Sequence, residues 1–83
     1  MPGKELARML NSDDLRDVDR TLLDYLNEGR VTPVYCTNRL VEEGQEYSRG
    51  YVRDRLARFV DHDHAQNLMD TGLYELVEDP RDE

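Results

Sequence analysis

Apolar residues recur at helical spacing in three stretches of the chain, and the first stretch follows Ser12, Asp13 and Asp14. Serine is a good helix N-cap, and carboxylates in a first turn face the unpaired N–H groups of a helix start. Gly29 is a typical residue just beyond a helix C-terminus. The pattern therefore predicts a first helix from Ser12 to Gly29. Its apolar stripe consists of Leu15, Val18, Leu22, Leu23 and Leu26.

A second, shorter helix is predicted after an extended link formed by Arg30 and Val31. Thr32 is a suitable N-cap, and Pro33 fits the first helical position, where a missing N–H costs nothing. Gly44 ends this helix. The residues expected to face inward are Cys36 and Leu40, with Val41 beside them.

A third helix is predicted to begin after a tight turn at residues 45–47, with Ser48 as its N-cap, and to end near Asp61. Its apolar residues repeat at intervals that place them on one side of a helix. They are Val52, Leu56, Phe59 and Val60.

Beyond the third helix the period changes, and residues 65–69 and 73–77 are predicted to form two short strands. A three-residue loop with Gly72 in the left-handed conformation joins the strands into a hairpin. Three helices followed by a two-stranded hairpin are the arrangement of an α+β winged helix-turn-helix domain, which covers residues 12–78.

The residues outside this domain are predicted to be a short N-terminal arm (1–11) and an acidic C-terminal tail that frays (79–83). The domain itself needs one apolar core, since 83 residues cannot support a second one. The predicted core consists of Leu15, Val18, Leu22, Leu26, Cys36, Leu40, Val52, Leu56, Phe59, Leu68 and Leu76.

Composition narrows the class of protein. No apolar run is long enough to cross a bilayer, and the N-terminus lacks the hydrophobic segment of a secretory leader. Cys36 is the single cysteine, which excludes an intramolecular disulfide and a cysteine-based zinc finger. We therefore expect a soluble, cytoplasmic protein.

The chain is strongly acidic, with 19 acidic and 11 basic residues and a net charge of -8. Such a composition is typical either of a disordered, self-repelling chain or of a folded protein adapted to molar salt, where carboxylates repel one another little. The clear helical periodicity favours the folded, salt-adapted protein.

Only the stretch that holds the second and third helices is net positive. Residues 1–29 carry 4 basic and 7 acidic groups (-3), residues 30–60 carry 6 and 4 (+2), and residues 61–83 carry 1 and 8 (-7). On a helical wheel the third helix turns its polar side chains away from the apolar stripe, and arginine grips guanine or phosphate through its planar fork. We therefore predict that residues 48–61 form a recognition helix in a DNA major groove. The predicted DNA-binding residues are Thr32, Ser48, Arg49, Gly50, Tyr51, Arg53, Asp54, Arg55 and Arg58.

An exposed arginine face can also be only a solvated surface, in which Asp54 and Arg58 form an ordinary i, i+4 ion pair. The reversal of charge within an acidic chain favours DNA contact over this interpretation.

Two other features have competing interpretations. The run Asp61-His62-Asp63-His64 contains residue types that bind zinc or nickel, but its two-residue spacing on a loop fixes no geometry, which favours a polar connection. Cys36 is a possible redox sensor, although its inward position favours packing as a small apolar residue. No nucleophile–base arrangement or glycine-rich phosphate loop is visible, so we predict no enzyme activity and no cofactor.

Three motifs together resemble one family. They are Thr32-Pro33, Ser48-Arg49-Gly50-Tyr51-Val52-Arg53, and Thr71-Gly72-Leu73-Tyr74-Glu75-Leu76-Val77. They look like the small haloarchaeal winged-helix regulators, including proteins similar to the repressor of the haloarchaeal phage phiH. The resemblance implies a DNA-binding transcriptional regulator in which Ser48, Arg49, Tyr51 and Arg53 lie at the reading end of the recognition helix. The wing departs from a DNA-gripping pattern, because its tip has Asn67, Asp70 and Thr71 in place of basic residues.

We therefore expect a sequence-specific, repressor-like regulator that binds double-stranded DNA at high salt as a homodimer. Leu6, Met9 and Leu10, together with the first helix, are the expected dimer contact. The alternative is a winged-helix protein–protein interaction module that binds no DNA. Regulation by a metal at His62 and His64 is a third possibility, and neither a membrane nor a small-molecule ligand is predicted as a partner.

Overall fold

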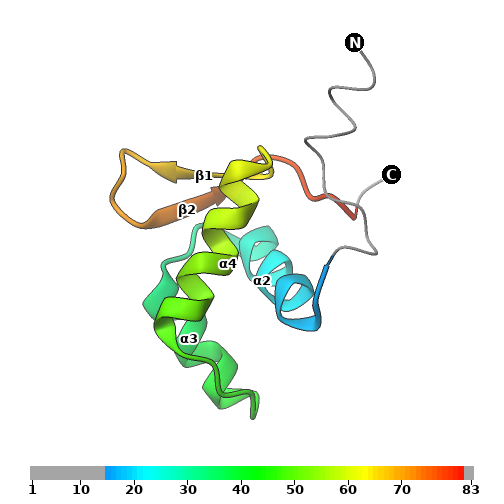
Figure 1. Cartoon of the computed structure of the whole chain (residues 1–83), viewed down its shortest axis with the longest axis vertical. Helices are drawn as coiled ribbons and strands as arrows, with labels where there is room; N and C mark the ends of the chain where they lie inside the picture. The colour runs from blue at the N-terminus through cyan, green and yellow to red at the C-terminus, as the bar shows by residue number, and fades with distance from the viewer. Residues whose placement is uncertain (1–14, 82–83) are drawn as a thin grey trace.

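The structure is a computed structural model that describes residues 15–81. Within them the chain forms three helices followed by an antiparallel two-stranded hairpin (Figure 1). The elements are α2 (Asp17–Glu28), α3 (Pro33–Glu42), α4 (Arg49–Asp61), β1 (Ala65–Leu68) and β2 (Leu73–Leu76). The fold is the predicted α+β winged helix-turn-helix. No helix in this part of the chain is long and apolar enough to cross a membrane.

The first helix begins later than its sequence pattern predicts. The proposed cap Ser12 lies outside the described residues, and α2 begins at Asp17 with Arg16 as its N-cap. The backbone N–H of Arg16 donates to Oδ2 of Asp19 at 2.9 Å, so a carboxylate inside the first turn closes the helix start. Gly29 ends α2 as predicted, and its N–H donates to the carbonyl of Leu26 at 3.2 Å.

The starts of α3 and α4 are those predicted. Oγ1 of Thr32 accepts a hydrogen bond from the backbone N–H of Tyr35 at 3.1 Å, and Oγ of Ser48 accepts one from Tyr51 at 3.0 Å. The predicted inward position of Val41 beside Leu40 is wrong, because Val41 is 51% exposed whereas Leu40 is buried.

The hairpin loop is longer than predicted. β1 ends at Leu68 and β2 begins at Leu73, so the loop has the four residues 69–72. Met69 has a φ of 53° and cannot continue a strand, which shortens β1 by one residue. Gly72 has the predicted left-handed conformation, with a φ of 81°. β2 also pairs with the link before α3, because Val31 and Tyr74 form an antiparallel bridge.

The core lies where α2, α3, α4 and the hairpin meet (Figure 1). Nine of the predicted core residues are buried, whereas Leu68 and Leu76 are only partly buried. The sequence pattern missed Tyr25 and Tyr74, whose rings are buried although tyrosine carries a polar hydroxyl. The buried apolar residues are Leu15, Val18, Leu22, Leu23, Tyr25, Leu26, Val31, Cys36, Leu40, Val52, Leu56, Phe59, Ala65 and Tyr74.

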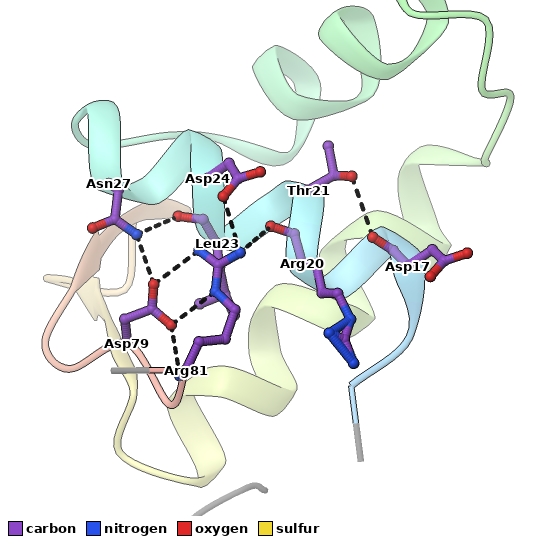
Figure 2. Close-up of polar contacts among 8 residues, drawn as sticks. All are labelled: Asp17, Arg20, Thr21, Leu23, Asp24, Asn27, Asp79 and Arg81. Atoms are coloured by element: carbon purple, nitrogen blue, oxygen red, sulfur yellow. Dashed lines mark hydrogen bonds and ion pairs between the residues drawn. The ribbon is translucent and has the colours of Figure 1, made fainter. Parts of the chain in front are cut away.

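The segment after β2 does not fray as predicted, at least to Arg81. Asp79 and Pro80 are buried, and Figure 2 shows Asp79 and Arg81 held against α2. The carboxylate of Asp79 accepts hydrogen bonds from Asn27 at 2.8 Å and from Nη2 of Arg81 at 2.9 Å. Nη1 of Arg81 lies 3.0 Å from Oδ1 of Asp24. We call Asp24, Asn27, Asp79 and Arg81 the C-terminal clasp. Residues 82–83 lie outside the described part of the chain.

Candidate nucleic-acid interface

α4 supplies most of the predicted DNA-binding residues. It buries Val52, Leu56 and Phe59 against the core, which turns the opposite side of the helix outward. On that outer side Tyr51 and Arg58 are half-buried. The exposed residues among those predicted are Ser48, Arg49, Gly50, Arg53 and Asp54.

The arginines differ in whether a carboxylate holds them. Four are paired at 2.5–2.9 Å: Arg30 with Glu75, Arg39 with Glu28, Arg55 with Asp19 and Arg81 with Asp79. Within residues 15–81, by contrast, the side chains of Arg49 and Arg58 have neither an ion pair nor a hydrogen bond. Arg53 has one long contact, 3.8 Å from its Nε to Oδ1 of the adjacent Asp54. Three of the four arginines on α4 therefore have no close carboxylate partner among these residues.

Arg55 does not lie on the exposed face, which corrects its predicted orientation. Its Nε donates to Oδ1 of Asp19 at 2.8 Å and its Nη2 donates to Oδ2 at 2.5 Å. The side chain of Arg55 is 13% exposed and that of Asp19 is 2% exposed. The hydrogen bonds to Asp19 raise the pKa of Arg55 above its ordinary value. Arg55 therefore joins α4 to α2, and its guanidinium is not free to contact a ligand.

Tyr51 is fixed in place at the start of α4. Its ring stacks on Tyr47 with a centroid separation of 5.3 Å, and its hydroxyl accepts a hydrogen bond from Nη1 of Arg16 at 3.2 Å. These contacts hold the first turn of α4 against the residue that caps α2.

Arg58 is the least satisfied arginine in the described part. Its Nε is buried and has no hydrogen-bond partner there. The i, i+4 pair with Asp54, which the solvated-surface interpretation requires, is not formed; Asp54 lies 3.8 Å from Arg53. A buried N–H without an acceptor is unfavourable. Because this Nε has no accessible surface, a phosphate oxygen reaches it only when the Arg58 side chain turns outward.

Thr32 and the wing tip contribute less to this surface. The hydroxyl of Thr32 is occupied as the cap of α3. At the wing tip Oδ1 of Asn67 accepts a hydrogen bond from the N–H of Gly72 at 2.8 Å, while Asp70 is exposed. Met69 is 93% exposed. The tip thus presents a carboxylate and a thioether, neither of which attracts phosphate.

His64 and Cys36 are both buried in the interior of the domain. His64 is buried, and its Nδ1 lies 3.0 Å from the carbonyl oxygen of Glu78. This contact joins the connection between α4 and β1 to the segment after β2. Burial lowers the pKa of His64. Among the described residues no group of three or more His, Cys, Asp or Glu side chains is arranged to hold a metal ion. Cys36 is completely buried in the core, and burial raises the pKa of its thiol to about 12.

Comparison of the chain with protein-family models, with curated proteins and with solved structures gives no match.

Proposed function

We propose that this protein binds double-stranded DNA sequence-specifically and regulates transcription, with α4 as the recognition helix in a major groove. The observation that carries the proposal is the pairing of the arginines. In a chain with a net charge of -8, carboxylates are abundant, yet Arg49, Arg53 and Arg58 on α4 have no close carboxylate partner within residues 15–81. Unpaired guanidinium groups on one helix are suited to phosphate oxygens and guanine edges.

The small number of these arginines limits the ionic part of binding. If all three contacted phosphate, which is the upper limit per protomer, the slope of log K against log[salt] would be about -2.7. Raising KCl from about 1 to 3 M would then weaken each protomer's binding by roughly 20-fold through counterion release. A much steeper loss would contradict this contact count. Contacts to base edges have to supply the remaining affinity at molar salt.

The proposal includes a homodimer, because one winged helix reads only a few base pairs and two-fold symmetric half-sites double the contact. The expected contact residues Leu6, Met9 and Leu10 lie outside the described part of the chain. The resemblance of the three sequence motifs to haloarchaeal winged-helix regulators also supports this proposal.

The second candidate function is a protein–protein interaction module. One observation favours it: α3 exposes the side chains of Val34, Tyr35 and Val41, which are 46%, 44% and 51% accessible. Exposed apolar side chains on one helix are typical of a surface that binds another protein. The unpaired arginines of α4 have no role in that function.

Fluorescence anisotropy at about 2 M KCl, with labelled duplexes from around the protein's own gene, distinguishes the two functions. We expect wild type to bind and the double variant Arg49→Ala/Arg53→Ala to lose most of its affinity. Arg30→Ala is the matched control, because it removes an exposed arginine that pairs with Glu75 away from α4. Equal binding by the double variant would show that α4 is not the recognition helix. Binding to no duplex at all would favour the interaction module.

A further inference from the structure

We propose that the surface formed by Arg49, Arg53 and Asp54 reads G·C base pairs, with the arginines on guanines and Asp54 on a cytosine. This inference rests on the proposed DNA binding and names the base pairs that it recognises. The inference follows from the side-chain hydrogen-bond donors and acceptors that α4 exposes, and from the residue types that α4 lacks.

The three side chains are free to contact a ligand. The side chains of Arg53 and Asp54 are 65% and 73% exposed, and Arg49 is also exposed. The separation of 3.8 Å between Nε of Arg53 and Oδ1 of Asp54 is too long for a hydrogen bond. Breaking such an exposed contact costs little, so both groups can turn toward base edges.

The chemistry of the three side chains matches one type of base pair. Arginine donates two hydrogen bonds to O6 and N7 of guanine, and a carboxylate accepts one from N4 of cytosine. Adenine is read by asparagine or glutamine, and residues 49–61 contain neither. The ring of Tyr51, which could contact a thymine methyl group, is half-buried and stacked on Tyr47. The surface thus has partners for guanine and cytosine and none that is specific for adenine.

Helix geometry sets the spacing of the bases. Arg49 and Arg53 are four residues apart, which separates them by about 6 Å along the axis. Successive base pairs are about 3.4 Å apart, so the two arginines reach guanines about two steps apart when the axis follows the groove. Asp54 is adjacent to Arg53 and reaches a base pair next to that guanine.

The first test is selection of bound duplexes from a random library at about 2 M KCl, followed by anisotropy on the selected site. We expect G·C pairs at two positions about two steps apart. Replacing one contacted guanine with 7-deazaguanine removes the N7 acceptor, and we expect affinity to fall roughly 5- to 150-fold. Replacing a guanine outside the selected positions of the duplex should leave the affinity of the wild-type protein unchanged.

The second test changes the specificity. Asp54→Asn supplies the side chain that reads adenine, so selection with this variant should replace the cytosine with adenine at one position. Glu78→Gln is the matched control, because it changes the net charge equally at an exposed residue beyond β2. It should leave the selected site unchanged.

The outcomes separate this inference from the proposed function. Tight binding with no base preference, a selected site rich in A·T pairs, or indifference to 7-deazaguanine would overturn the G·C assignment and leave DNA binding intact. Binding to no member of the library would overturn both. Selection of spaced guanines together with the Asp54→Asn switch would support the assignment.

Discussion

Removing the carboxylate of Asp79 from the C-terminal clasp should destabilise the fold measurably, although Asp79 lies near the end of the described chain. Asp79 is 5% exposed and accepts hydrogen bonds from Asn27 and from the backbone N–H, Nε and Nη2 of Arg81. Asp79→Ala deletes all of these bonds. Among residues 15–81 it also leaves the guanidinium of Arg81 with the exposed carboxylate of Asp24 and the carbonyl of Arg20 as its remaining partners.

The magnitude follows from the pKa of Asp79. Burial acts to raise it, but the hydrogen bonds from Arg81 and Asn27 outweigh burial and lower the pKa from 3.8 to about 2. This difference corresponds to roughly 2 kcal/mol of stability. Because the pKa is lower in the folded protein, the contribution is present above pH 3.8 and is lost as the pH falls toward 2. For a domain of this size, 2 kcal/mol corresponds to a decrease in Tm of about 10 °C.

The assay is urea unfolding followed by circular dichroism, for wild type and Asp79→Ala, at pH 7 and at steps down to pH 2.5. The difference in unfolding free energy should be near 2 kcal/mol at pH 7 and shrink below pH 4. Asp24→Ala is the control, because Asp24 is 64% exposed and its pair with Arg81 should contribute less than about 1 kcal/mol. A difference under about 0.5 kcal/mol at pH 7, or one that does not change with pH, would refute this reasoning.

Three further predictions concern the interior and the wing. Asp19→Asn leaves the guanidinium of Arg55 without its buried counter-charge and should lower the unfolding free energy by about 3–5 kcal/mol in urea titrations; a loss below about 1 kcal/mol would mean that water replaces the carboxylate. Cys36 should react with a thiol reagent at pH 8 only as fast as the protein unfolds, because its thiol is buried and its pKa is about 12; rapid labelling of folded protein would contradict this. Gly72→Ala should cost about 1 kcal/mol, because the φ of 81° suits glycine although the space around it is open; an unchanged Tm would argue against backbone strain there.

Features that depend on neighbours in sequence were predictable. The caps Thr32 and Ser48 and the stop at Gly29 each act within a few residues, so a local pattern contains all that they need. The apolar stripe of α4 was predictable for the same reason, because its period is fixed by the helix.

Features that depend on partners distant in the sequence were not predictable. The wheel places Arg55 outside the apolar stripe of α4, but it cannot show that α2 brings Asp19 against it from 36 positions away. The clasp was missed for the same reason, since Asn27 and Asp79 are 52 positions apart. Composition also misled here, because a charged, proline-containing segment is usually solvated and not buried.

The bridge between Val31 and Tyr74 has a consequence for how the molecule unfolds. The two residues exchange backbone hydrogen bonds of 2.9 and 2.7 Å, and both are buried. The hairpin therefore cannot separate from the helices without breaking bonds in the link that joins α2 to α3. The amide protons of Val31 and Tyr74 should exchange with solvent as slowly as those in the middle of α2, and the whole domain should melt in one cooperative transition.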